Sequence, residues 1–162
     1  MTGRAWVFGD ELDTDLLAPG AYMKGPIETL AGHVLEAVDP GFATAVQPGD
    51  ILVAGRNFGI GSSREQAAEA LKVLGLAAVV ARSFGGIFYR NAFNLGLPAI
   101  ECDGVAAIST GDRLTLDAAG GRIRNETTGE VLTCLPVPAH LMRLVQVGGL
   151  LNHLAAQQEK SP

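Results

Sequence analysis

Short apolar runs alternate with stretches of helical periodicity in the first hundred residues of the chain. Ile51–Ala54 and residues 76–81 are continuous apolar runs, a pattern typical of strands buried on both faces. Between them, apolar residues recur at helical spacing over residues 65–74, and Gly75 provides the helix stop. This alternation of strand and helix predicts an α/β fold.

The alternation continues on both sides of this unit. Residues 5–8 have the character of a strand, and residues 27–38 form a helical stretch. A second helix is predicted over residues 86–95, ending at Gly96 before Pro98. We therefore expect helices to flank the apolar strands.

The C-terminal third has a different pattern, in which polar and apolar residues alternate between turns that contain glycine. The turns are predicted at residues 120–121 and 128–129. They separate three strands of a small antiparallel patch, Arg113–Asp117, Arg122–Asn125 and residues 130–134. We expect a tail helix over residues 139–157, with an interruption at residues 148–149. The polar residues 155–162 are expected to be frayed.

Composition narrows the class of protein. The chain has 162 residues, of which 48% are hydrophobic, and this is enough for one domain over residues 1–162 with its own core. Its apolar runs are shorter than a membrane span, and a strand-like segment follows the first residues directly, so we expect no membrane association and no signal peptide. A net charge of −5 argues against nucleic acid as the main partner. We expect a cytoplasmic protein.

The two cysteines, Cys102 and Cys134, are far apart in the sequence and lack the paired spacing of metal ligands. This spacing predicts neither a disulfide framework nor a metal site built from this chain alone.

The most informative stretch for chemistry is residues 55–66, Gly-Arg-Asn-Phe-Gly-Ile-Gly-Ser-Ser-Arg-Glu-Gln. Its second and third glycines, Gly59 and Gly61, allow sharp turns and close approach of the backbone. Ser62, Ser63 and Arg64 follow at the expected start of a helix. Backbone N–H groups, two hydroxyls and a guanidinium at a helix N-terminus are suited to hold a small carboxylate or phosphate.

A purely structural interpretation of the same serine is also open. Ser62 followed by Glu65 fits a capping box, with Ser62 as the N-cap residue. That interpretation leaves the second serine, Arg64 and the glycines unexplained. The stretch also lacks the ending of a P-loop and the third glycine of a dinucleotide fingerprint, which argues against nucleotide binding.

Two further segments accompany this motif. Residues 9–20 read Gly-Asp-Glu-Leu-Asp-Thr-Asp-Leu-Leu-Ala-Pro-Gly, and residues 83–98 read Ser-Phe-Gly-Gly-Ile-Phe-Tyr-Arg-Asn-Ala-Phe-Asn-Leu-Gly-Leu-Pro. In this order, the three segments resemble the small subunit of 3-isopropylmalate dehydratase, which corresponds to the swivelling domain of the aconitase superfamily. The resemblance spans most of the first hundred residues and implies a single compact swivel-like β/β/α domain.

The resemblance also implies a reaction and a site. Such a subunit acts with a large subunit that carries a [4Fe–4S] cluster, and together they isomerise 2-isopropylmalate, a 2-hydroxy dicarboxylate, by dehydration and rehydration in leucine biosynthesis. By resemblance, Ser62 is the catalytic base and Arg64 binds a substrate carboxylate. Thr14 and Asp15 match the Thr-Asp that lines the family's active site, although turn chemistry alone explains an Asp-Thr-Asp segment equally well. Gly61 and Ser63 are further substrate contacts.

Lys24 is the residue expected to influence the choice of substrate. It stands in Tyr22-Met23-Lys24-Gly25, at the position that contacts the substrate's variable group in the family. Its ammonium can meet a carboxylate, or its stem can cover an alkyl group. We favour an alkyl malate, because Met23 is adaptable and Gly25 leaves room.

One departure from the family pattern falls at Gly85 and Gly86, where an alanine and a bulkier residue are expected. Two glycines are predicted to loosen the start of the helix by about 1 kcal/mol each relative to alanine. Two alternatives stay open. The first is that the chain is the small subunit of a paralogous dehydratase acting on dimethylmalate, homoaconitate or another 2-hydroxy diacid instead of isopropylmalate. The second is that it is a non-catalytic anion-binding module.

Overall fold

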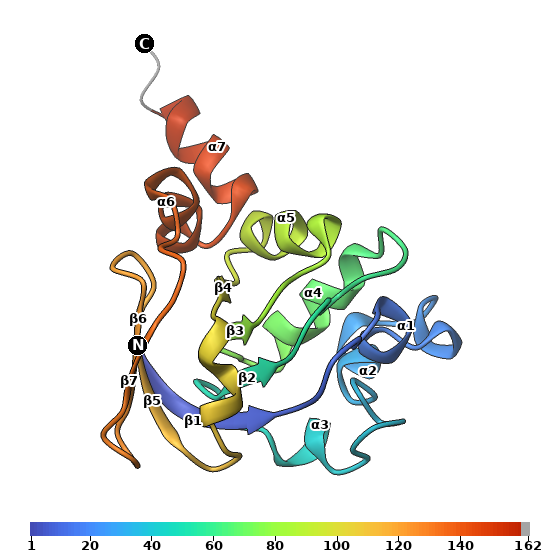
Figure 1. Ribbon diagram of the computed structural model, residues 1–162. Helices are drawn as coiled ribbons and strands as arrows, with labels where there is room; N and C mark the ends of the chain where they lie inside the picture. The colour runs from blue at the N-terminus through green and yellow to red at the C-terminus, as the bar shows by residue number, and fades with distance from the viewer. Residues whose placement is uncertain (160–162) are drawn as a thin grey trace.

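A computed structural model describes residues 1–159, and in this part of the chain seven strands form a mixed sheet in the order β4-β3-β2-β1-β5-β6-β7 (Figure 1). The strands are β1 (Thr2–Val7), β2 (Ile51–Ala54), β3 (Ala78–Ala81), β4 (Ala99–Glu101), β5 (Arg113–Asp117), β6 (Arg122–Asn125) and β7 (Val131–Thr133). The helices are α1 (Thr14–Leu17), η1 (Gly20–Tyr22), α2 (Ile27–Ala31), α3 (Phe42–Ala45), α4 (Glu65–Val73), α5 (Gly86–Asn94), η2 (Asp103–Ala107), α6 (Ala139–Val147) and α7 (Leu150–Glu159).

Strands β1 to β4 are parallel, and each new strand is added on the same side of the previous one. Right-handed crossovers in one direction place their helices on one face of the sheet. Accordingly, α4 contacts α2 on one side and α5 on the other, and these helices cover the parallel strands (Figure 1).

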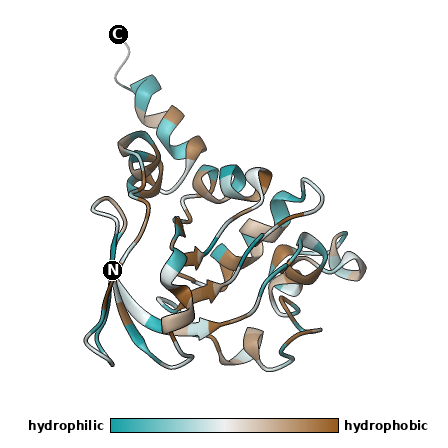
Figure 2. Cartoon of the chain, in the orientation of Figure 1, coloured by the Kyte–Doolittle hydropathy of each residue, from teal (hydrophilic) through white to brown (hydrophobic). Residues whose placement is uncertain are grey.

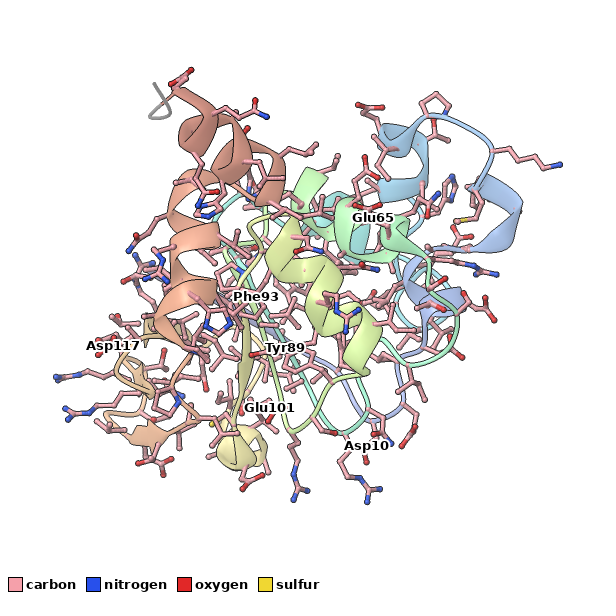
Figure 3. The ribbon with its side chains drawn as sticks, turned by 90° about the horizontal axis from the view of Figure 1, so that it is seen from above. Asp10, Glu65, Tyr89, Phe93, Glu101 and Asp117 are labelled. Atoms are coloured by element: carbon pink, nitrogen blue, oxygen red, sulfur yellow. The ribbon has the colours of Figure 1, made fainter. Side chains whose placement is uncertain are left out.

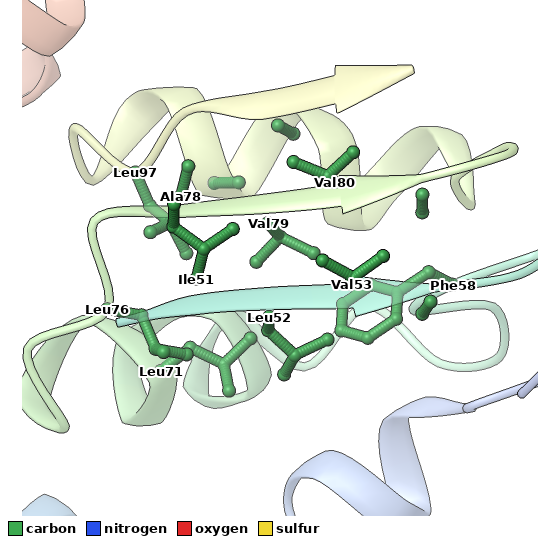
Figure 4. Close-up of a cluster of buried hydrophobic side chains, with 14 of the residues drawn as sticks. Ile51, Leu52, Val53, Phe58, Leu71, Leu76, Ala78, Val79, Val80 and Leu97 are labelled. Carbon is green, nitrogen blue, oxygen red and sulfur yellow. The ribbon is translucent and has the colours of Figure 1, made fainter. Parts of the chain in front are cut away.

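The core lies between these strands and their helices. Every residue of β2 and β3 is buried, as the continuous apolar runs predict. Figure 4 shows Ile51, Leu52 and Val53 beside Val79 and Val80, with Leu71 of α4 packed below them. Hydrophobic residues are concentrated on these strands, whereas the outer helices carry polar faces (Figure 2).

Strand β1 joins the parallel and antiparallel parts of the sheet. Its first half pairs with β5 and its second half with β2, so β1 bends and the two parts lie in different planes. Beyond β7, the Leu135 N–H donates to the carbonyl of Glu101 on β4 at 3.0 Å. The sheet therefore curls back on itself, which confirms the single α/β domain with a mixed sheet.

Several expected elements have different limits in the structure. The helix predicted over residues 27–38 ends at Ala31, because Leu35 adopts a φ of 58° and its N–H bonds to the carbonyl of Leu16 instead of a helical partner. The sequence pattern did not predict strand β4. The helix at the end of the chain continues to Glu159, so residues 155–159 are helical, and residues 160–162 lie outside the described part.

Within residues 1–159, no helix is long and apolar enough to cross a membrane.

Candidate active site

Three loops meet at the carboxyl ends of β1, β2 and β3, the edge at which parallel sheets carry their ligand sites. We call them the β1 loop (residues 8–13), the β2 loop (residues 55–64) and the β3 loop (residues 82–85). Backbone hydrogen bonds of 2.7–3.0 Å connect the first two loops, and three more of 2.8–3.1 Å connect the second and third. Figure 3 shows Asp10 in the β1 loop and Glu65, the first residue of α4, after the β2 loop.

The β2 loop requires two of its glycines. Gly59 has a φ of +77°, and a Cβ there would overlap the ring of Phe88. Gly61 has a φ of +113°, and a Cβ there would lie 2.9 Å from the Oγ1 atom of Thr14. Both positions therefore need a residue without a side chain. The close approach at Gly61 allows the β2 loop to pass directly over Thr14.

Thr14 and Ser62 form the first pair of polar groups in the site. The backbone N–H of Ser62 donates to Oγ1 of Thr14 at 3.2 Å, and the two hydroxyl oxygens are 3.2 Å apart. The Thr14 side chain is buried, whereas Ser62 is exposed to solvent. A buried hydroxyl therefore holds an accessible hydroxyl in place.

The alternative interpretation of Ser62 as a helix cap is contradicted by the structure. The N-cap residue of α4 is Arg64, with φ of −63° and ψ of 104°, and no side chain caps the helix. Ser62 lies two residues before that position, where its side chain bonds to Thr14 rather than to a helical N–H. The capping explanation of this serine is thereby removed.

Arg64 and Asp15 form the second pair. The Arg64 guanidinium makes an ion pair with the carboxylate of Asp15 and donates to the carbonyl of Ala18 at 3.2 Å. The Arg64 side chain is 29% exposed and that of Asp15 72% exposed, so the pair borders solvent. Arg64 is fixed by the Ala18 carbonyl, and its exposed partner is one that a competing carboxylate can replace.

The structure thus brings together five of the seven residues predicted for the site: Thr14, Asp15, Gly61, Ser62 and Arg64. Ser63 and Lys24 are exposed, and within residues 1–159 neither side chain hydrogen-bonds to the other five. Lys24 follows η1, which is anchored by Tyr22. The Tyr22 ring stacks on His33 with ring centres 3.7 Å apart, and His33 Nδ1 lies 2.6 Å from Glu36 Oε2.

Sequence reasoning missed three residues that hold the loops together. Asn57 adopts a φ of 58° and donates from its side chain to Glu11 Oε1 at 2.8 Å, and its backbone N–H donates to Oγ of Ser83 at 2.8 Å. Asparagine tolerates the left-handed conformation, so Asn57 before Phe-Gly was an available signal. For its partners Glu11 and Ser83 the sequence provided no such signal, because they come from loops that are distant in the sequence.

Gly85 and Gly86 have different roles. Gly85 is the N-cap residue of α5 and lies outside the helix, and a Cβ on it would approach the Gly59 carbonyl oxygen to 2.9 Å. A Cβ on Gly86 would meet nothing within 4 Å. The prediction of a loosened helix start therefore concerns Gly86 alone, because the packing of the β3 loop against the β2 loop requires Gly85.

The described residues do not provide ligands for an iron–sulfur cluster. Among residues 1–159, no three His, Cys, Asp or Glu side chains are grouped so that they could hold a metal ion. The cysteines Cys102 and Cys134 are buried free thiols that directly follow β4 and β7, outside the three site loops. A cluster that needs several thiolates does not fit this site.

Residues 17–104 match the family described as the aconitase C-terminal domain, so the fold and the loops at its strand ends define an aconitase swivel domain. A solved structure of 3-isopropylmalate dehydratase from Methanocaldococcus jannaschii superposes with a TM-score of 0.91 and 39% identity, covering 99% of this chain and 98% of that one. The 3-isopropylmalate dehydratase small subunit 1 of Methanopyrus kandleri is 52% identical over 93% of this chain and 89% of its own length.

A methanogen homoaconitase small subunit from Methanothermobacter thermautotrophicus is 48% identical over 93% of this chain and 88% of its own length. An isopropylmalate/citramalate isomerase small subunit from Methanocaldococcus jannaschii is 45% identical over 98% and 96%. The chain belongs to the 3-isopropylmalate dehydratase small subunit family, as the three sequence segments predict.

Proposed function

We propose that this chain is the small subunit of a cytoplasmic 3-isopropylmalate dehydratase, which interconverts 2-isopropylmalate and 3-isopropylmalate in leucine biosynthesis. The observation that carries the proposal is that one loop presents an accessible serine, held by Thr14, and a half-buried arginine, paired with Asp15. A serine positioned by a buried hydroxyl supplies a base, and the arginine supplies a carboxylate-binding group. Dehydration of a 2-hydroxy diacid requires both functions, a base for the carbon-bound proton and a group that holds a carboxylate.

Ser62 is the proposed base. In the dehydration step its oxygen takes the proton from the substrate carbon, the C–H electrons form the double bond, and the hydroxyl leaves from the neighbouring carbon. In rehydration a proton adds to the carbon that lost the hydroxyl, and a hydroxyl adds to the carbon that lost the proton, which gives the isomer. A free serine alkoxide is far too basic for neutral pH, so the site must stabilise it. A hydroxyl proton from Thr14 and the N-terminus of α4 are the groups available for this.

Arg64 orients the substrate. A substrate carboxylate replaces Asp15 as the partner of the guanidinium, while the Ala18 carbonyl keeps the side chain in place. Two parallel hydrogen bonds from guanidinium to carboxylate fix both distance and orientation. Ser63 and Gly61 provide further contacts through a hydroxyl and through backbone that a side chain does not cover.

A [4Fe–4S] cluster, bound by the large subunit, would act as the Lewis acid for the leaving hydroxyl. Because the residues of this chain do not fit such a cluster, we assign it entirely to that partner. The small subunit then contributes only proton transfer and substrate binding.

Mixing this chain with its cluster-bearing large subunit tests the proposal. The assembled protein is expected to hydrate and dehydrate isopropylmalate. The chain alone, treated anaerobically with iron and sulfide, should show no turnover and no visible absorbance from a stable cluster. Binding of malates without turnover in the mixture would instead support an anion-binding module. A stable, active cluster on the isolated chain would contradict the two-subunit assignment.

A second candidate is a paralogous dehydratase acting on homoaconitate, a tricarboxylate. The observation that favours it is Lys24, an exposed cation on the segment proposed to contact the substrate's variable group. A cation suits the additional carboxylate of a tricarboxylate better than it suits an isopropyl group. Comparing substrates decides between the two candidates.

A further inference from the structure

The two cysteines are far apart in the sequence but lie together where the segment after β7 contacts the end of β4, which we call the sheet closure. Cys102 directly follows β4 and Cys134 directly follows β7. Strand β7 runs opposite to β4, because the pairs β1–β5, β5–β6 and β6–β7 are antiparallel and β1 to β4 are parallel. The bond from the Leu135 N–H to the Glu101 carbonyl sets the register, and this register puts Cys102 opposite Cys134.

The side chains agree with this register. The Cys102 thiol donates to the carbonyl of Thr133, the residue before Cys134, at 3.8 Å, and both cysteines line the same cavity. Residues that follow a hydrogen-bonded pair in an antiparallel ladder have Cα atoms about 4.5 Å apart, within the range of about 4.4–6.8 Å that a disulfide spans. The thiols are therefore neighbours that a disulfide can join without moving the backbone far.

A cavity gives small molecules access to this pair. Cys102 and Cys134 are 2% and 6% exposed, and both line a cavity of about 280 Å³ together with Arg82, Glu101 and Asp103. Figure 3 shows Glu101 at the end of β4, beside this closure. A volume of this size admits several water-sized molecules, whereas a protein thiol cannot reach the sulfurs.

We propose that Cys102 and Cys134 are a redox-active thiol pair, which a small peroxide converts into an intramolecular disulfide across the closure of the sheet. This modification site shares no residue with the Ser62 site and is independent of the substrate assigned above.

Cys102 is the thiol that reacts first. The hydrogen bond from the Cys134 thiol lowers the pKa of Cys102 to about 7, whereas the same interaction and burial raise the pKa of Cys134. Burial and, to a smaller extent, the charge of Asp103 oppose this lowering of the Cys102 pKa. Arg82 and Glu101 are the other charged groups at the cavity. A substantial thiolate fraction at neutral pH makes Cys102 the nucleophile.

The chemistry balances with hydrogen peroxide as the oxidant. The Cys102 thiolate attacks one peroxide oxygen, an S–O bond forms, the O–O bond breaks, and hydroxide leaves to give a sulfenic acid. The Cys134 sulfur then attacks the Cys102 sulfur, the S–O bond breaks, and its oxygen leaves as water with the Cys134 proton. Two thiols and one peroxide thus give one disulfide and two waters.

The experiment treats the full chain with hydrogen peroxide and measures intact mass, free thiols and thermal unfolding. We expect the mass to fall by two hydrogens, both thiols to resist alkylation after denaturation, and a thiol reductant to restore them. Because the bridge closes a loop of about 30 residues, the unfolding temperature should rise by about 5–15 °C. The reaction rate should increase as the pH passes through about 7.

Two matched variants test the order of reaction. In Cys134→Ser, dimedone should trap a sulfenic acid on Cys102, whereas Cys102→Ser should stay unmodified at the same peroxide dose. Thermal unfolding of both reduced variants shows whether each substitution leaves the protein folded. The disulfide test on the wild type stands even if a variant fails to fold. Thiols that remain free in the oxidised wild type, or a disulfide formed only between two chains, would overturn the proposal.

Discussion

At the residue scale, the proposed base is Ser62, whose side chain does not cap the helix that follows it. Replacing Ser62 with alanine removes only a contact between two hydroxyls, because the backbone N–H of residue 62 still reaches Thr14. We expect Ser62→Ala to change the free energy of unfolding by less than about 1 kcal/mol. Turnover of the assembled enzyme should fall at least about 10²-fold, because the base is lost.

Urea unfolding and steady-state kinetics of the variant measure the two effects separately. Ser63→Ala is the matched control and should be milder. Near-normal turnover in both variants would contradict the assignment of the base.

Thr14 is expected to act as a positioning residue for Ser62. In Thr14→Val the shape of the side chain is kept, but the Ser62 N–H and hydroxyl lose their partner. We expect kcat to fall about tenfold, equivalent to about 1.4 kcal/mol, with a small change in KM. Thr14→Ser, which keeps the hydroxyl, should recover most of the rate, and failure of this rescue would point to a packing effect instead.

Lys24 is the residue to test for substrate choice. We expect the wild-type enzyme to prefer isopropylmalate, and Lys24→Ala to lose kcat/KM selectively on homoaconitate if the ammonium pairs with the extra carboxylate. The measurement is kcat/KM for isopropylmalate, dimethylmalate and homoaconitate in both proteins. An equal change on all three substrates would show that this segment does not distinguish the variable group.

At the scale of elements, the start of α5 separates a required glycine from a dispensable one. Gly86→Ala should stabilise the protein by about 0.5–1 kcal/mol, because alanine favours the helix and its Cβ meets open space. Gly85→Ala should destabilise it by about 1–3 kcal/mol, because its Cβ presses on the β2 loop. Chemical denaturation of the two variants gives both values, and similar effects would contradict this distinction.

The sequence predicted the elements whose signals are local. Strands β2, β5 and β6 have the expected limits, because apolar runs and turn glycines mark them. Strand β4 was missed, since only three residues after Pro98 pair with β3. The helix over residues 27–38 was too long because a tertiary bond from Leu35 replaced a helical one.

The candidate site was predicted less completely than the fold. Its residue types follow from the motif of residues 55–66, but the partner of each residue does not. Thr14 and Ser62 are separated by 48 positions, and the pairing of Arg64 with Asp15 spans 49. Periodicity carries no information on such contacts, which depend on how the ends of parallel strands come together.

At the scale of the whole molecule, Asp112 links the two parts of the sheet. Its backbone carbonyl accepts from Ala5 of β1, and its carboxylate accepts from the Ser109 N–H at 2.9 Å and from the Asn125 amide of β6 at 2.8 Å. These hydrogen bonds lower the pKa of Asp112 below its ordinary value, the Ser109 bond contributing most. The stabilisation is therefore fully present above the ordinary carboxyl pKa and is lost as the pH falls through the lower, folded value.

We expect Asp112 to contribute no change in stability between pH 7 and pH 5, and a loss below about pH 4. Asp112→Asn should be less stable at pH 7 and should lose less on further acidification. Thermal unfolding across this pH range measures both effects, with the exposed Glu130→Gln as the control. An acid response of Asp112→Asn identical to that of the wild type would show that Asp112 does not link the two parts.

The connections between the three site loops have an evolutionary consequence. They consist largely of main-chain N–H and C=O groups, which every amino acid except proline supplies in full. Exposed side chains such as Lys24 can therefore mutate without dismantling the framework that presents the base. A lineage with this design can acquire a new substrate through single surface substitutions while staying folded at each step.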